Sequence, residues 1–115
     1  MQPGQSSTEV RSGAHAGQQV LRATGPITLA IVPEFQAAVR SATGTSLIID
    51  LSQVPFIDSA ALGVLVQAYV SCQKAGRRLV LVGLSHRVKA LLQMTTLDLL
   101  FTTHPTLGDA EQALA

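Results

Sequence analysis

The sequence predicts an α/β domain, a small and mostly parallel sheet with about four helices packed on it. Two short apolar runs, at residues 46–51 and 78–83, have the continuous hydrophobic character of strands that are covered on both faces. Between them, residues 60–76 are long enough for about four helical turns. A strand, a helix and a strand in this order favour a parallel pair joined by a right-handed crossover.

The amino-terminal residues carry little that can be buried. Residues 1–18 are polar, rich in Gly, Ser and Gln, and without periodicity. We therefore expect a flexible tail there, partly strand near Glu9 to Arg11. The folded domain is then expected over residues 19–115.

The first regular elements follow this segment. A strand is expected at residues 20–24, stopped by the Gly-Pro pair that comes next. Residues 27–30 are either a short second strand or a lead-in to a helix. That helix is expected near Pro33, because Pro is tolerated in a first turn and Glu34 suits the positive end of the helix dipole. Its apolar face is formed by residues at spacings of three and four, namely Phe35, Ala38 and Val39.

Three further elements complete the predicted order. A third helix is expected after Ser85, and a last strand at residues 99–103. Thr106 and Asp109 have the spacing of a capping box, so they predict a short carboxyl-terminal helix.

Composition excludes several classes of protein. The 115 residues fit one domain, and a net charge of +1 gives no strong field towards nucleic acid or a membrane surface. No apolar run approaches the roughly 18 residues that span a bilayer, and the amino terminus lacks the pattern of a signal peptide. Cys72 is the single cysteine, so an internal disulfide is excluded. We expect a soluble cytoplasmic protein without a membrane or direct nucleic-acid partner, and with Cys72 in its core.

The Asp58-Ser59 pair interrupts an otherwise apolar stretch and has a structural explanation. Both residue types are good N-caps, because a side-chain oxygen accepts a hydrogen bond from an unpaired N–H of the first helical turn. Ser59 directly precedes the helical pattern of residues 60–76, so capping by Ser59 alone would justify its presence.

The same placement also suits regulation. A helix that follows a buried strand begins at the carboxyl edge of the sheet, where partners and ligands bind in open α/β folds. A kinase can reach a hydroxyl there, and phosphorylation would add about −1.5 to −2 charges at pH 7. The helix end tolerates an anion. A docked partner would meet that anion beside the carboxylate of Asp58, so phosphorylation of Ser59 would switch binding without unfolding the protein.

A stripe of small and polar residues leads away from Ser59 along the helix. Ala60, Gly63 and Gln67 recur at spacings of three and four, and Ser71 and Lys74 continue the series. The stripe is either an ordinary solvated face or a surface for a partner. Gly63 favours the partner, because Gly inside a helix costs roughly 0.5–1 kcal/mol relative to Ala and permits close approach of another backbone. The sheet and the neighbouring helices are expected to contact the apolar residues Leu62, Leu65, Val66, Tyr69, Val70 and Cys72.

The sequence gives little support for hydrolase, metal or nucleotide-binding chemistry. The residues around Ser59 lack the Gly-x-Ser-x-Gly pattern of a serine hydrolase, and His15, His86 and His104 are scattered. Metal-ligand spacings and glycine-rich phosphate-binding loops are absent from the sequence. The basic residues at 77–78 and 86–89 are expected to be solvated surface. We therefore expect no enzyme, no catalytic residue, no metal and no cofactor.

Residues 47–66, LIIDLSQVPFIDSAALGVLV, resemble the signature segment of STAS domains, specifically the bacterial anti-sigma factor antagonists. The pattern is an apolar strand ending in Asp-Leu-Ser, then an aromatic residue, an aliphatic residue, Asp-Ser and a helix. Residues 76–101 also match, so the resemblance covers about residues 19–115. It implies a small STAS-like fold with a mixed sheet, in which the amino-terminal strand runs against the parallel core.

The resemblance implies a partner that is both an anti-sigma factor and a serine-protein kinase. Binding to it releases a sigma factor and starts transcription, and phosphorylation of the Asp-Ser serine separates the complex. Ser59 would be the phosphoacceptor. The expected partner-binding residues are Thr28, Asp58, Ser59, Ala60, Gly63 and Gln67. A homodimer is compatible with this interpretation.

The chain departs from the family pattern at two places. The family often has Ser or Thr and then Gly after the acceptor, where this chain has Ala60 and Ala61. The family often has an acidic residue where this chain has Thr28. A second hypothesis is therefore a STAS domain without phosphorylation, which acts as an interaction module or small-ligand sensor of a larger complex, with Ser59 only as a cap.

Overall fold

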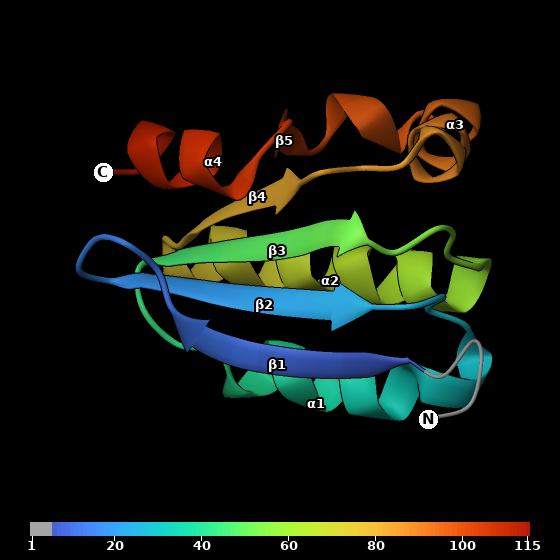
Figure 1. Ribbon diagram of the computed structural model, residues 1–115, viewed down its shortest axis with the longest axis horizontal. Helices are drawn as coiled ribbons and strands as arrows, with labels where there is room; N and C mark the ends of the chain where they lie inside the picture. Colours follow the sequence, from blue (N-terminus) through green and yellow to red (C-terminus); the bar gives the residue numbers. More distant parts are fainter. Residues whose placement is uncertain (1–5) are drawn as a thin grey trace.

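The computed structural model describes residues 6–115, which form a five-stranded sheet in the order β1-β2-β3-β4-β5 (Figure 1). The strands are β1 (Ser7–Ser12), β2 (Gln18–Thr24), β3 (Ser46–Gln53), β4 (Arg78–Val82) and β5 (Thr102–His104). The helices are α1 (Val32–Ser41), α2 (Ser59–Ala75), α3 (His86–Met94) and α4 (Leu107–Ala113), with short 3-10 helices η1 (Leu29–Ile31) and η2 (Leu97–Leu99). Strands β2 to β5 are parallel and β1 is antiparallel to β2, which confirms the predicted mixed sheet.

The two faces of the sheet are covered unequally. Side chains of β2, β3 and β4 pack with α1, α2 and α3 in the larger core, around Phe35, Ile49 and Leu65. On the other face, Ile48 and its neighbours pack with α4 and with Leu114, which follows that helix. Consecutive right-handed crossovers place their helices on one side of a parallel sheet, so this layering follows from the strand order.

Strand β1 corrects the predicted tail. Residues 7–12 pair along their length with β2, so regular structure begins within the segment expected to be flexible. The sequence predicts only partial strand at residues 9–11, because the only apolar residue of β1 is the half-buried Val10. Main-chain pairing, rather than side-chain burial, holds the full strand. The exposed charges of Glu9 and Arg11 suit an edge strand. Residues 1–5 of the predicted tail lie outside the described residues.

The carboxyl-terminal half follows the prediction with one change. The last strand begins at Thr102 rather than at residue 99, because Leu97–Leu99 forms η2 and buried Phe101 anchors the chain on the core first. Only three residues of β5 then pair with Val80–Val82. The lead-in interpretation of residues 27–30 is confirmed, since η1 begins at Leu29 within this segment and leads directly into α1.

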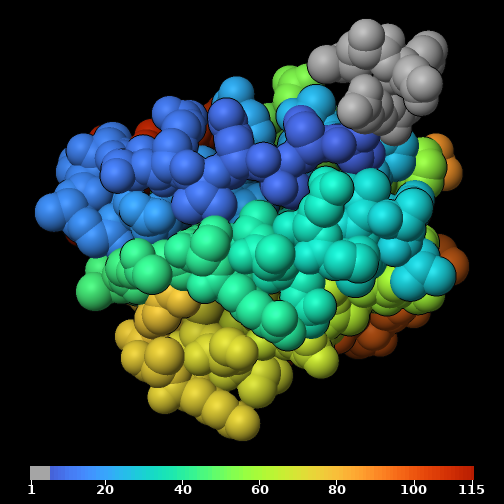
Figure 2. Space-filling view, turned by 90° about the horizontal axis from the view of Figure 1, so that it is seen from below, coloured from blue at the N-terminus to red at the C-terminus, as the bar shows by residue number. Residues whose placement is uncertain are grey.

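Helices α1 and α2 lie side by side and form the outer surface of the larger core (Figure 2). Both begin at the carboxyl edge of the sheet, where β2 and β3 end. Helix α2 ends at Gly76, which has the left-handed conformation with φ 69° that favours glycine. Among residues 6–115, the structure contains no helix with the length and apolar character needed to cross a bilayer.

Candidate functional site at the amino terminus of helix α2

The Asp58-Ser59 pair lies where two loops run side by side at the carboxyl ends of β2 and β3. Ile27, after β2, forms an isolated parallel bridge with Ile57, after β3, and both side chains are buried. The backbone N–H of Asp58 donates to the Ile27 carbonyl at 3.1 Å. This bridge continues the β2–β3 pairing beyond the strands, so it fixes the start of α2 relative to the turn after β2.

Asp58, rather than Ser59, is the N-cap of α2. It has extended backbone angles, φ −101° and ψ −178°, and its Oδ1 accepts a hydrogen bond from the Ala61 N–H at 3.0 Å. Its Oδ2 accepts another from the Leu29 N–H at 2.8 Å. The prediction of a Ser59 cap is wrong because a carboxylate has two oxygens that reach both N–H groups at once, whereas serine has one.

The charge of Asp58 is stabilised by this arrangement. The hydrogen bond from the Ala61 N–H is the main cause that lowers the pKa of Asp58 below its ordinary value of 3.8. Burial opposes this shift, and the hydrogen bond from the Leu29 N–H adds to it. The site therefore carries a negative charge at neutral pH.

Ser59 is the first residue of α2, and its side chain is exposed. Because Asp58 supplies the cap, the helix does not need the Ser59 hydroxyl. At Ala61, where the family often has glycine, the methyl side chain is fully buried in the core and the backbone N–H still donates to the Asp58 cap. The helix thus begins normally on an Ala-Ala pair and leaves the serine hydroxyl at the surface.

The predicted stripe is present on α2. Gly63 and Gln67 are exposed one and two turns beyond Ser59, and Ala60 is half-buried beside them. A Cβ added to Gly63 would meet nothing within 4 Å. Packing within the described chain therefore gives no reason for glycine at this position.

Thr28 lies on the turn that Asp58 holds. Its carbonyl accepts hydrogen bonds from the N–H groups of Ile31 and Val32, and its side chain is half-buried. The structure thus places Thr28 close to Asp58. Both residues belong to the predicted partner-binding set. The sequence prediction missed its neighbour Leu29, whose side chain is 70% exposed. An exposed leucine beside the site has no signal in the sequence, where residues 27–31 look like an apolar run.

Helix α3 supports the loop before Ser59. The Ser85 hydroxyl caps α3 through the Val88 N–H and also donates to the Pro55 carbonyl at 3.0 Å. The Arg87 guanidinium lies 4.4 Å from the centre of the Phe56 ring, a cation–π contact. The prediction that Arg87 is merely solvated surface missed this contact, because the two residues meet only through the fold.

Within residues 6–115, no three His, Cys, Asp or Glu side chains gather closely enough to hold a metal ion. Cys72 is buried in the core, as predicted, and burial raises the pKa of its thiol.

A model of the STAS domain family matches residues 7–110. Over 55 residues the chain is 44% identical to the anti-sigma-B factor antagonist of Listeria monocytogenes, and it matches the Listeria innocua protein of the same name equally well. These matches cover 48% of this chain and 48% of each relative, so the matched segment spans about half the length of these curated relatives.

Solved structures resemble the chain over nearly its whole length. An anti-sigma factor antagonist from Mycobacterium paratuberculosis has a TM-score of 0.86 at 29% identity, covering 97% of this chain and 96% of that protein. The Bacillus cell fate determinant SpoIIAA in its phosphorylated form has a TM-score of 0.75 at 17% identity, covering 95% and 100%. At that identity the second likeness shows the fold alone.

Proposed function

The chain belongs to the STAS domain family, and on this premise we propose that it is an anti-sigma factor antagonist switched off by phosphorylation of Ser59. Its partner is an anti-sigma factor that is also a serine kinase, and binding releases a sigma factor in the cytoplasm. The names of the similar Listeria and Mycobacterium proteins support this role. The chain itself has no catalytic role in the proposal, because the partner transfers the phosphate.

The observation that carries the proposal is an exposed serine hydroxyl at the first position of α2, beside a carboxylate that already caps the helix. A phosphate on Ser59 would lie at the positive end of the helix dipole, so the fold is expected to survive. It would place about −1.5 to −2 charges next to the charge of Asp58. A partner docked there would face two adjacent anions, and like charges across an interface oppose binding.

The proposed partner surface consists of Thr28, Asp58, Ser59, Ala60, Gly63 and Gln67. Gly63 fits this role because its exposed backbone allows close approach and packing within the described chain does not require it. This is the reason for preferring a partner surface over an ordinary solvated helix face.

The test measures the affinity of the protein for each purified anti-sigma factor of its source organism by isothermal titration calorimetry. Ser59→Ala should bind like the wild type, and Ser59→Asp should bind at least about tenfold more weakly. Ser12→Asp is a matched control, because Ser12 is also exposed but lies on β1 opposite Gln19, at the other edge of the sheet. Circular dichroism should show that all variants are folded.

Two results would contradict the proposal. If the wild type bound none of these anti-sigma factors, the antagonist role would be wrong. If the wild type and Ser59→Asp bound equally, the chain would be a STAS interaction module without the switch.

A further inference from the structure

A groove of about 510 Å³ lies between α1 and α2. Its lining on α2 begins at Val64, beyond the first turn of that helix. Its lining is mostly apolar and includes Val39 from α1 and Val66 and Val70 from α2. Val70 is 44% exposed, although its place in the apolar pattern of α2 predicts contact with the sheet or a neighbouring helix. The side chain of Val70 is therefore an apolar group at the surface, on the rim of an apolar groove.

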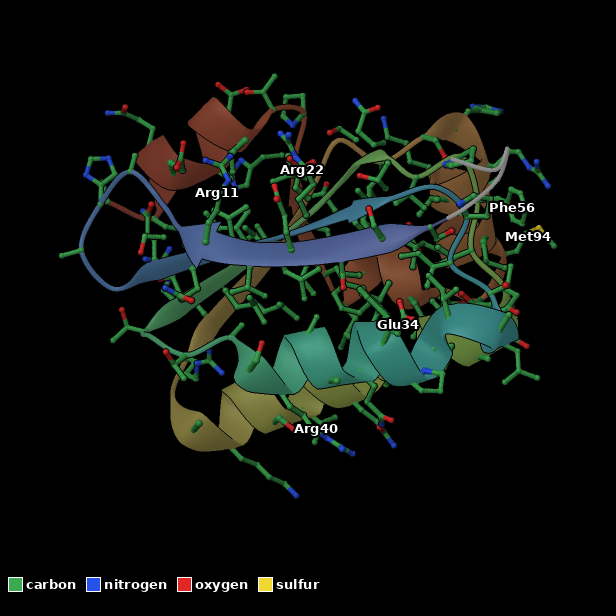
Figure 3. The ribbon with its side chains drawn as sticks, turned by 60° about the horizontal axis from the view of Figure 1, so that its bottom comes forward. Arg11, Arg22, Glu34, Arg40, Phe56 and Met94 are labelled. Carbon is green, nitrogen blue, oxygen red and sulfur yellow. The ribbon has the colours of Figure 1, made fainter. Side chains whose placement is uncertain are left out.

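The charges around the groove have one sign. Its lining contains Arg40 and Arg77 but no Asp or Glu. Arg77 donates to the carbonyls of Gly44 and Ala42 at 2.7 and 3.2 Å, so its guanidinium holds the chain around the end of α1. Arg40 is exposed and projects from α1 away from the sheet (Figure 3). Within residues 6–115 it forms no salt bridge, so it is available to a carboxylate from outside.

The groove is continuous with the proposed partner surface. Gln67 belongs to the exposed stripe that begins at Ser59 and also lines the groove. It lies about 12 Å along the helix from Ser59, at 1.5 Å per residue. A specific interface typically buries about 800 Å² on each partner. The small side chains of the stripe offer little apolar area, and the groove adds an adjoining apolar surface to that of Leu29 for a partner that contacts Ser59.

We propose that the groove binds an apolar side chain from an acidic segment of the same anti-sigma factor that recognises Ser59. A carboxylate of that segment pairs with Arg40, while the apolar side chain enters between Val39 and Val70. This inference rests on the proposed function and deepens it. Ser59 provides the switch, and the groove provides affinity at a distance from the phosphate.

The test uses the anti-sigma factor that binds the wild type in the calorimetric experiment above. Val70→Asp should weaken binding at least about tenfold, because it places a charge in an apolar contact and beside an acidic segment. Arg40→Glu should weaken it by roughly three- to tenfold and reduce its dependence on salt. Met94→Asp is the matched control, since Met94 is 81% exposed but lies at the end of α3, and it should change affinity less than about twofold.

The first two of the following outcomes separate the groove inference from the proposed switch. If Ser59→Asp weakened binding while Val70→Asp and Arg40→Glu bound like the wild type, the groove inference would be wrong and the switch would stand. If light scattering showed a wild-type dimer that Val70→Asp dissociated without loss of partner affinity, a second copy of this chain would be the occupant and the inference would fail. If no anti-sigma factor bound the wild type, the proposed function and this inference would both be wrong.

Discussion

The backbone N–H of Leu29 lies 2.8 Å from Oδ2 of Asp58, while the other oxygen of the same carboxylate caps α2. One side chain therefore ties the turn after β2 to the first turn of the helix that presents Ser59. The candidate site is assembled from two segments that are distant in the sequence. Its geometry depends on Asp58 and not on the serine that is proposed to change.

Loss of the Asp58 carboxylate should destabilise the fold. We expect Asp58→Ala to lower the free energy of unfolding by about 1–2 kcal/mol, because the first-turn N–H of Ala61 and the N–H of Leu29 lose their acceptor. Urea denaturation measures the change. Asp98→Ala is the control, since Asp98 is an exposed acid in η2. Equal effects of the two substitutions would show that the Asp58 contacts contribute nothing specific.

The same carboxylate should make stability depend on pH. Because the folded state lowers the pKa of Asp58 below 3.8, its charged form stabilises the fold at pH values above 3.8. This contribution is lost as the pH falls through the lowered pKa. The stability difference between the wild type and Asp58→Asn should therefore shrink as acid is added, as measured by urea denaturation across this range. A difference that stayed constant, or grew in acid, would show that the hydrogen bonds do not favour the charged form.

Gly63→Ala should separate stability from function. A methyl group at this position meets nothing within 4 Å, so helix propensity alone should stabilise the protein by roughly 0.5–1 kcal/mol. The same methyl group should weaken binding to the anti-sigma factor, because it prevents close approach of the partner. Thermal unfolding and calorimetry measure the two effects. A variant that was more stable and bound equally well would remove Gly63 from the partner surface.

Arg22 should stabilise the fold through its ion pair with the buried side chain of Asp50. Arg22 Nη2 lies 3.2 Å from Asp50 Oδ2, and the Asp50 side chain is only 2% exposed. We expect Arg22→Ala to destabilise the fold by about 1–3 kcal/mol, less than for a fully buried pair because the Arg22 side chain is 39% exposed. Arg11 lies on the same side of the sheet as Arg22 (Figure 3), and Arg11→Ala should change stability by less than about 0.5 kcal/mol. If urea denaturation gave the same free energy of unfolding for Arg22→Ala and Arg11→Ala, the ion pair would have no structural role.

Apolar runs and helical periodicity predicted most of the fold. Strands β3 and β4 and helix α2 agree with the sequence to within one or two residues, because burial on both faces leaves an unmistakable apolar pattern. The full extent of strand β1 and the bounds of strand β5 could not be predicted in this way. Both are edge strands held mainly by main-chain pairing, which leaves no side-chain periodicity.

The residues of the candidate site are proposed from the sequence, but their geometry could not be predicted from it. The sequence places Asp58 and Ser59 at a helix start, yet the choice of Asp58 as the cap depends on Leu29, a residue on another loop. The contact of Arg87 with Phe56 and the exposure of Val70 likewise depend on how elements distant in the sequence pack together. Periodicity describes a single element, so it cannot show which side chains meet between elements.

The proposed switch requires that a phosphate on Ser59 separates the protein from its anti-sigma factor. Native mass spectrometry of the complex, before and after addition of ATP, tests it most directly, with peptide mapping to locate any phosphate. We predict one phosphate per chain, located on Ser59, and loss of the complex, whereas a complex with Ser59→Ala should persist. A complex that persisted with Ser59 phosphorylated, or that separated with Ser59 unmodified, would show that Ser59 is not the switch.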